Sequence, residues 1–380
     1  MGISDTFLRE DYAMSEQKLE ATQRRGHAAP DPDHDAKPDS PTDLKGQSWG
    51  YVFKRALSEF SKDGCTDLAA SLTYFAVLSV FPALLALVSL LGVFGQGEAT
   101  TTAILDFLEQ YAPPELVSLL SGPISQLTTQ SGAGLALIVG VAGALWTASG
   151  YTGAFGRAMN RIYEVSEGRP FLKLKPVMLL VTLAVVLIVA LVMFMVLLSG
   201  DIAQTVGDLV GLGSTAVTVW NWAKIPVILF LVVLLIALLY YATPNVKQPK
   251  FRWMSPGAVI ALVAMGLAGA AFAFYVTNFA SYNATYGVIG SVIILLLGLW
   301  IMNNVLLFGA EVDAEVERGR QLQGGLRAEG TIQLPPRDVR QTKKLQAKEE
   351  KLEAEGRKLR LQHDHIDYSS DSDDSKDSKN

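Results

Sequence analysis

The chain has 380 residues, 50% of them apolar, and its 32 basic and 37 acidic residues give a formal net charge of −5. Because this balance produces no overall positive field, the sequence predicts no nucleic-acid partner. The single cysteine, Cys65, excludes an intramolecular disulfide and any metal site built from a cysteine cluster. Both ends of the chain are charged, so the apolar residues are concentrated in the middle.

Residues 1–48 form the first predicted region. They combine four prolines with many charged side chains and contain no apolar segment typical of a secretory signal. They bury too little apolar surface to offset the entropy lost on ordering, so we expect a disordered tail. From Trp49 to Phe60, apolar residues recur at helical spacing opposite a charged face. This pattern predicts an amphipathic helix on the cytoplasmic surface of a membrane.

Six apolar segments follow, and a hydrocarbon core of about 30 Å needs about 20 helical residues to cross it. The chain therefore has the pattern of an all-α, polytopic membrane protein whose membrane domain extends over residues 49–320. The predicted spans are Leu72–Gly95, Ala133–Phe155, Val177–Ser199, Ile225–Ala242, Pro256–Phe279 and Gly287–Gly309.

The distribution of basic residues predicts the orientation of these spans, because lysine and arginine resist transfer across a membrane. The connections at residues 96–132, 200–223 and 280–286 contain no lysine or arginine, whereas the alternate connections contain several. We therefore expect both termini in the cytoplasm and the protein in the inner membrane. In the first outer connection, apolar residues at helical spacing around Pro113 and Pro114 predict two interfacial helices, with a soluble loop as the alternative.

Residues 321–380 form the third predicted region, a charged cytoplasmic tail. The last span continues as a charged helix through Arg320, and Pro335 and Pro336 interrupt it. Three leucines then recur every seven residues from Leu345 to Leu359, which is too few heptads for a coiled coil, so we expect a solvated charged helix. The final sequence SSDSDDSKDSKN predicts disorder.

Two groups of polar residues are candidate functional positions. Asn303 and Asn304 lie inside the last span, where an amide requires a partner, so interhelical hydrogen bonding is expected and a polar route is the alternative. Arg157, Asn160 and Arg161 follow the second span. They are either topology signals or a site for anionic lipid headgroups or an anionic substrate, because a guanidinium group binds phosphate bidentately.

A catalytic metal site is not expected. All four histidines lie in the charged tails, and the sequence HDHID at residues 363–367 lacks the other ligands that a site would need. We therefore expect no metal, no cofactor and no enzymatic activity. The sequence predicts neither an oligomeric state nor a substrate.

From about Trp49 to Arg318 the chain resembles the YihY/BrkB membrane proteins, a family historically mislabelled ribonuclease BN. The resemblance implies a six-helix inner-membrane domain in a family linked to envelope properties, without an agreed molecular activity. It rests on ordered blocks: SLTYFAVLSVFP at 71–82, LWTASGYTGAFGRAMNRIYEV at 145–165, YYATPNVK at 240–247, YNATYGVIGSVIILLLGLW at 282–300 and GAEVDAEVER at 309–318.

Together these features favour transport or translocation of an amphipathic or anionic envelope component, with the bilayer and anionic headgroups as partners. A membrane scaffold that organises envelope machinery without transporting anything is the alternative. An internal polar cavity would favour transport, and a closed apolar bundle would favour the scaffold.

Overall fold

The structure is a computed structural model that describes residues 18–93, 133–197, 214–249, 255–279 and 282–362. Within these ranges the regular elements are helices, and the one β contact is an isolated bridge between Val246 and Pro336. The predicted interfacial helices at 96–132 and the predicted disorder after residue 368 lie outside the described residues.

A long helix lies on each of the six predicted spans. Four of these helices are long and apolar enough to cross a membrane over their described residues. The segment Cys65–Ser79 of the first helix is a shorter apolar stretch that overlaps the first predicted span. These features confirm the predicted all-α, polytopic membrane fold. The six helices are α3 (Cys65–Val93), α6 (Ala133–Ile162), α7 (Phe171–Leu197), α9 (Ser214–Ala242), α10 (Pro256–Phe279) and α11 (Tyr282–Gln323).

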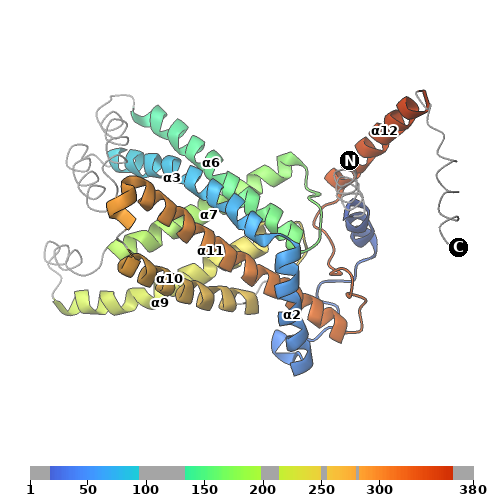
Figure 1. The fold of residues 1–380 in the computed structure, drawn as a ribbon, viewed down its shortest axis with the longest axis horizontal. Coiled ribbons are helices and arrows are strands. Elements are labelled where there is room, and N and C mark those ends of the chain that lie inside the picture. The colour runs from blue at the N-terminus through green and yellow to red at the C-terminus, as the bar shows by residue number, and fades with distance from the viewer. Residues whose placement is uncertain (1–17, 94–132, 198–213, 250–254, 280–281, 363–380) are drawn as a thin grey trace, which may run out of the picture.

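Neighbouring helices pack side by side around the bundle. α3 contacts α6 and α11, α10 contacts α11, and α7 lies between α6 and α9. Figure 1 shows that these helices lie close together where α2 (Gly46–Lys62) crosses the bundle, and spread apart toward the opposite end. We call the end of the bundle that α2 crosses the α2 end.

Most of the tight packing lies near the α2 end. Phe155, Met159, Ile236 and Leu307 are fully buried there in one apolar cluster. A Cβ atom added to Gly257 of α10 would lie only 2.0 Å from the carbonyl oxygen of Gly309 on α11. Glycine therefore permits the close crossing of these two helices, as small residues commonly do in membrane bundles.

Along the rest of the bundle, many large apolar side chains are exposed. Examples are Leu180 and Leu187 of α7, Leu267 and Phe274 of α10, and Ile293 of α11. Only 17–28% of the residues in the most apolar windows of α7, α9, α10 and α11 are buried. This exposure fits helices that are surrounded by lipid.

The predicted helix after Trp49 is present as α2, but it packs partly against protein. Its Val52 and Ala56 are buried against Val316 of α11 in a small cluster, whereas Phe53 and Leu57 remain exposed. One face of the amphipathic helix therefore covers α11, and only part of its apolar surface is free to contact lipid.

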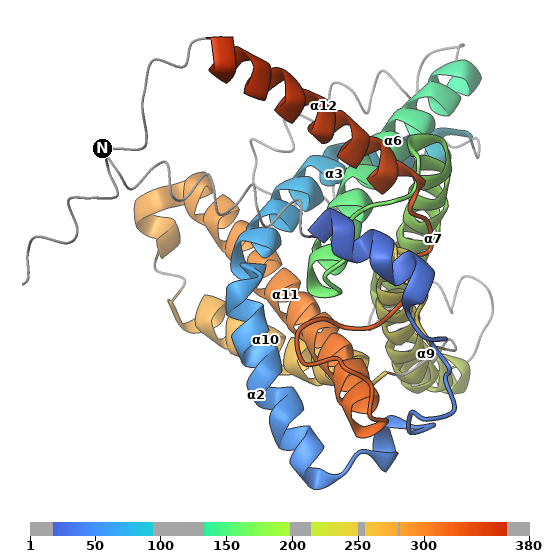
Figure 2. The same cartoon turned by 90° about the vertical axis from the view of Figure 1, so that its right-hand side faces the viewer.

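The structure differs from the predicted disorder at residues 18–48. Residues 18–28 are helical, Leu19 and Leu44 are buried, and a short 3-10 helix follows at Pro41–Asp43. Figure 2 shows this segment and the chain after α11 lying across the α2 end. Hydrogen bonds and ion pairs between distant segments offset the ordering cost here, and the composition of the tail alone does not show them.

The helix predicted within the C-terminal tail is α12 (Arg340–Gln362), which extends away from the bundle (Figure 1). Its Leu345, Leu352 and Leu359 are exposed, as a solvated charged helix requires.

A buried polar layer at the α2 end

The part of α11 beyond Gly309 contains charged residues that are buried under other segments. Apolar Val312 and Val316 face α2, and charged residues occupy the other positions of these turns. Buried charges are costly unless they are paired, so their partners determine whether the arrangement is stable. The buried charged residues of α11 are Glu311, Glu315, Glu317, Arg318 and Arg320.

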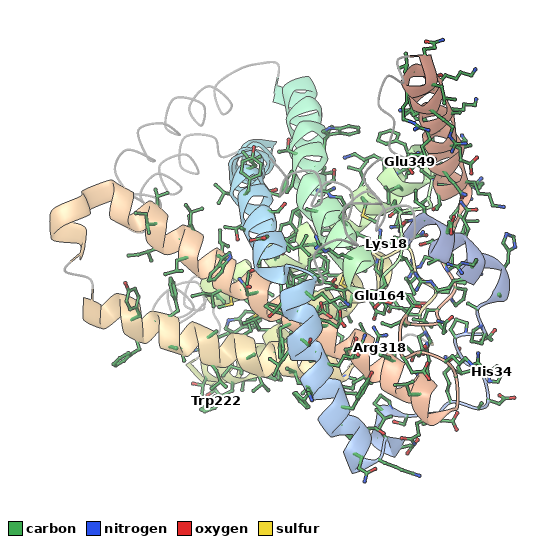
Figure 3. The ribbon with its side chains drawn as sticks, turned by 45° about the vertical axis from the view of Figure 1, so that its right-hand side comes forward. Lys18, His34, Glu164, Trp222, Arg318 and Glu349 are labelled. Carbon is green, nitrogen blue, oxygen red and sulfur yellow. The ribbon has the colours of Figure 1, made fainter. Side chains whose placement is uncertain are left out.

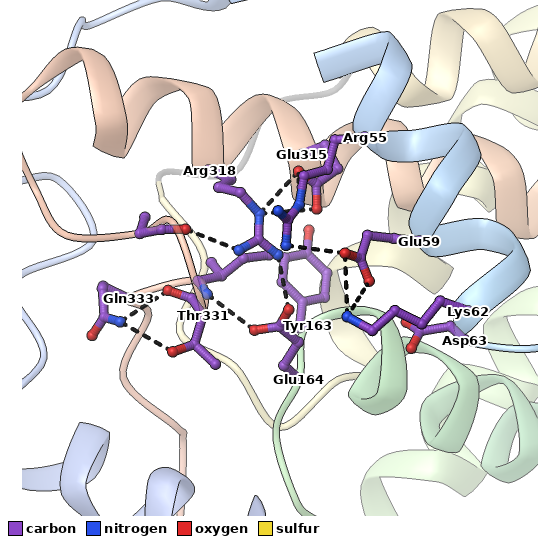
Figure 4. Close-up of polar contacts among 12 residues, drawn as sticks. Arg55, Glu59, Lys62, Asp63, Tyr163, Glu164, Glu315, Arg318, Thr331 and Gln333 are labelled. Atoms are coloured by element: carbon purple, nitrogen blue, oxygen red, sulfur yellow. Dashed lines mark hydrogen bonds and ion pairs between the residues drawn. The ribbon is translucent and has the colours of Figure 1, made fainter. Parts of the chain in front are cut away.

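Arg318 is the centre of this layer, with only 1% of its side chain exposed. Its Nε donates to both carboxylate oxygens of Glu315, at 3.0 and 2.9 Å, and its Nη2 lies 2.8 Å from Glu164 Oε1. Its Nη1 donates to the carbonyl oxygen of Ala328 at 2.9 Å. The guanidinium group thus joins α11, the loop after α6 and the chain after α11 (Figure 4).

Glu164 has an unusual backbone conformation that positions its carboxylate. Its φ is 54°, which is uncommon for a residue other than glycine, and it directly follows the last turn of α6. The amide of Val165 donates to the carbonyl of Asn160 at 2.8 Å and closes the end of that helix. Glu164 Oε2 also accepts a hydrogen bond from the amide of Ile332 at 3.1 Å.

α2 contributes a second group of charges to the layer. Arg55 Nη2 lies 3.0 Å from Glu59 Oε1, and Arg55 Nε lies 3.6 Å from Glu315 Oε2. Lys62 pairs with Glu59 at 3.1 Å. The charged face of α2 is therefore turned in part toward α11.

Asp63 ends α2 at the edge of the layer and is mostly buried. Burial, assisted by Glu59 and Glu164, raises the pKa of Asp63 to about 6. Lys18 and Arg161 act in the opposite direction, and Arg161 Nε lies 3.9 Å from Asp63 Oδ1.

The N-terminal segment is tied to the same layer. Arg25 Nη1 donates to the carbonyl of Ile332 at 2.7 Å, and Lys37 Nζ lies 3.0 Å from Glu317 Oε1. Arg320 donates to the carbonyl of Pro38 through Nε at 2.9 Å and through Nη2 at 2.7 Å. Segments that are about 280 to 307 residues apart in the sequence therefore close the α2 end together.

Asn303 is buried and joins three helices of the membrane domain. Its Oδ1 accepts a hydrogen bond from the hydroxyl of Tyr151 on α6 at 2.9 Å, and its Nδ2 donates to Thr73 Oγ1 on α3 at 3.1 Å. Asn304 Nδ2 instead donates to the carbonyl of Trp300, one turn earlier on α11, at 2.8 Å. The structure therefore gives the two adjacent amides different partners.

The three residues after the second span are not brought together. Asn160 is buried, accepts a hydrogen bond from the amide of Asn245 at 2.6 Å and donates to Glu167 at 2.9 Å. Arg157 and Arg161, one turn apart on α6, are exposed. The guanidinium group of Arg157 lies 5.8 Å from the ring centroid of Phe75.

The sequence interpretation missed the buried polar layer. The sequence predicts that the charged residues after Gly309 continue the last helix, and the structure contains this helix. The sequence does not indicate that these charged side chains are buried. The spacing of Glu315 and Arg318, and of Glu317 and Arg320, is the one available signal, because residues three apart on a helix lie side by side. The partners Glu164 and Arg25 lie too far away in the sequence for spacing to reveal them.

Among the described residues, no group of three or more histidine, cysteine, aspartate or glutamate side chains could hold a metal ion. The sequence HDHID lies just beyond these residues.

The membrane domain is similar to known bacterial proteins. Residues 56–330 match the family model described as virulence factor BrkB. Over 272 residues the chain is 30% identical to the ribonuclease-like protein YfkH of Bacillus subtilis (strain 168), covering 71% of this chain and 96% of that protein. It is 27% identical to a UPF0761 membrane protein of Alkalilimnicola ehrlichii, covering 70% of this chain and 59% of that protein. No solved structure matches.

Proposed function

Because the chain belongs to the virulence factor BrkB family of membrane proteins, we propose that it transports or translocates an amphipathic or anionic component of the cell envelope. In this proposal the protein lies in the inner membrane, and the α2 end, with both terminal segments, faces the cytoplasm. The absence of lysine and arginine from the connections at 96–132, 200–223 and 280–286 supports this orientation.

The observation that carries the proposal is a closed α2 end together with apolar helix faces that are uncovered in the described part of the bundle. The α2 end is closed by apolar packing and by the buried polar layer, and large apolar side chains of α7, α9 and α10 are exposed along the bundle. A carrier with alternating access needs one closed end at a time. Exposed apolar helix faces also allow acyl chains to contact the protein.

Arg157 and Arg161 are the proposed contact for an anionic headgroup. They are exposed on one face of α6, and their spacing of four allows both guanidinium groups to approach one phosphate. Asn160, which points elsewhere, is better suited to holding Asn245 than to a headgroup. We therefore restrict the proposed anion site to the two arginines.

A lipid translocation assay tests this function. Proteoliposomes would contain fluorescent phosphatidylglycerol or fluorescent phosphatidylethanolamine, and dithionite would bleach only the label that reaches the outer leaflet. Translocation predicts more bleaching than in protein-free vesicles for at least one lipid. Bleaching equal to that of protein-free vesicles for both lipids would contradict the proposal and favour a non-transporting scaffold.

The double substitution Arg157→Lys and Arg161→Lys separates charge from the guanidinium fork. Lysine keeps the positive charge that determines orientation but cannot bind phosphate bidentately. We expect unchanged abundance and topology together with several-fold weaker binding to vesicles rich in phosphatidylglycerol. If lipid binding is also unchanged, the two arginines act as topology signals alone.

A scaffold is the second candidate function, and Asn303 favours it. Both ends of this amide are occupied by interhelical hydrogen bonds, so it does not form a free polar surface in the described part of the bundle. A nuclease, which the name of the Bacillus subtilis relative suggests, has less support, because the described residues provide no group of metal ligands.

A further inference from the structure

A small crevice of about 90 Å³ lies at the α2 end, beside the buried polar layer. It is located where α9 ends at Ala242 and α10 begins at Pro256, which are also the predicted boundaries of two spans. The predicted spans place the headgroups of a surrounding bilayer at this level. Its lining includes Tyr163, Tyr240, Tyr241, Asp313, Glu317 and Arg320. We call it the Asp313 crevice.

The crevice has two acidic residues, Asp313 and Glu317. The hydrogen bonds found for the Asp313 carboxylate come from uncharged donors. Its Oδ1 accepts the amide of Gly257 at 2.6 Å, and its Oδ2 accepts the hydroxyl of Ser255, so it caps the start of α10. Glu317, in contrast, is paired with both Lys37 and Arg320. No ion pair to Asp313 is found among the described residues. An ionised carboxylate has about four lone-pair positions, so these two bonds leave acceptor capacity.

Tyr163 provides the second polar group. Its side chain is only 5% exposed, lines the crevice and points toward α11 (Figure 4). Burial and the negative charges of Asp313 and Glu317 raise the pKa of this tyrosine, so its hydroxyl is neutral. Within the described part of the chain no hydrogen bond to this hydroxyl is found, and it is not among the fully enclosed polar atoms that lack a partner. It is therefore accessible from the crevice, where a ligand or water can hydrogen-bond to it.

The chemistry of the lining selects the class of ligand. The described residues hold no group of three metal-ligating side chains, so a bare metal ion is disfavoured. A carboxylate that forms no ion pair within the described part of the chain, a hydroxyl that can accept a hydrogen bond, and aromatic walls are suited to an organic cation instead. We infer that the Asp313 crevice binds the primary ammonium group of an amphipathic molecule, with Asp313 as the counterion and the Tyr163 hydroxyl as a hydrogen-bond partner.

This inference rests on the proposed function in one respect: it specifies an ammonium group as the headgroup of the amphipathic molecule that the protein is proposed to transport. Binding of an ammonium group is measured without translocation, so the two ideas fail separately. A phospholipid headgroup and a free amine share this chemistry, and the test below distinguishes them.

Tyr163→Phe is the informative variant, because it removes this hydroxyl and keeps the ring. The purified full chain in detergent would be titrated with ethanolamine and, separately, with micelles containing phosphatidylethanolamine or phosphatidylglycerol. We expect Tyr163→Phe to bind phosphatidylethanolamine with threefold to tenfold lower affinity than the parent chain. Its affinity for phosphatidylglycerol, which has no ammonium group, and its melting temperature should be unchanged. Binding of ethanolamine alone would identify a free amine as the ligand.

Tyr151→Phe is the matched control, because its hydroxyl bonds Asn303 outside the crevice. It should lower the melting temperature and leave ammonium binding unchanged. If Tyr163→Phe binds these ligands as well as the parent chain, or if no ammonium compound binds, the inference is wrong and the crevice holds water only.

Discussion

Arg318 joins three segments at the α2 end through a guanidinium group that is almost completely buried. Removing one partner of a buried ion pair leaves the other charge uncompensated and typically costs about 3–5 kcal/mol. We therefore expect Arg318→Ala to lower the melting temperature of the detergent-purified protein strongly. Arg340→Ala is the control, because Arg340 pairs with Asp338 at an exposed position. Equal melting temperatures for the two variants would contradict the importance of the buried layer.

Asp63 makes stability depend on pH. Its pKa is about 6 in the folded chain, whereas an aspartate in an unfolded chain titrates near 4. Between these values the folded state binds more protons, so stability falls as the pH rises through this interval, by about 3 kcal/mol at most. Asp63→Asn removes this loss, and its melting temperature should exceed that of the parent chain by more at pH 7.5 than at pH 5. Asp67→Asn removes an exposed carboxylate four residues away and is the control variant measured at the same two pH values.

At the scale of helices, Asn303 and Asn304 form a matched pair for testing interhelical contacts. Asn303 bonds α3 and α6, whereas the bond found for Asn304 among the described residues is to its own helix. Hydrogen bonds between membrane helices contribute about 0.6–2 kcal/mol. Asn303→Leu should therefore lower thermal stability, and Asn304→Leu should have a smaller effect. The reverse order would show that the described contacts of Asn303 do not hold the helices together.

The contacts of the N-terminal segment lead to a second prediction at the scale of helices and segments. Composition alone indicates that residues 1–45 are dispensable for insertion, but Arg25, Lys37 and Leu44 are buried against the bundle. Deleting residues 1–45 should therefore reduce the folded yield, measured by fluorescence size-exclusion chromatography. Truncation after Glu350 removes residues 351–362, the exposed part of α12, and the chain beyond it, and should leave the yield unchanged. A normal yield after the N-terminal deletion would restore the original expectation.

For the whole molecule, the sequence predicts the membrane fold because hydropathy and helix length are local properties. Each of the six predicted spans lies on a helix. The positions of charged residues can also be read from the sequence. Which of these residues form ion pairs in the folded chain cannot be read from it. The burial of Arg318 depends on Glu164, which is 154 residues away, and the order of the N-terminal segment depends on Ile332, which is 307 residues from Arg25. These long-range pairs explain why the polar layer was missed.

The proposed headgroup contacts and the closed end are both located at the α2 end, so the proposed function requires this end to face the cytoplasm. Fusion of alkaline phosphatase, which is active only outside the cytoplasm, tests this orientation most directly. Fusions after Gln126 and Gly211 should be active, and a fusion after Lys173, between α6 and the start of the third span, should be inactive at comparable abundance. An active fusion at Lys173 with inactive fusions at Gln126 and Gly211 would invert the topology and contradict the account.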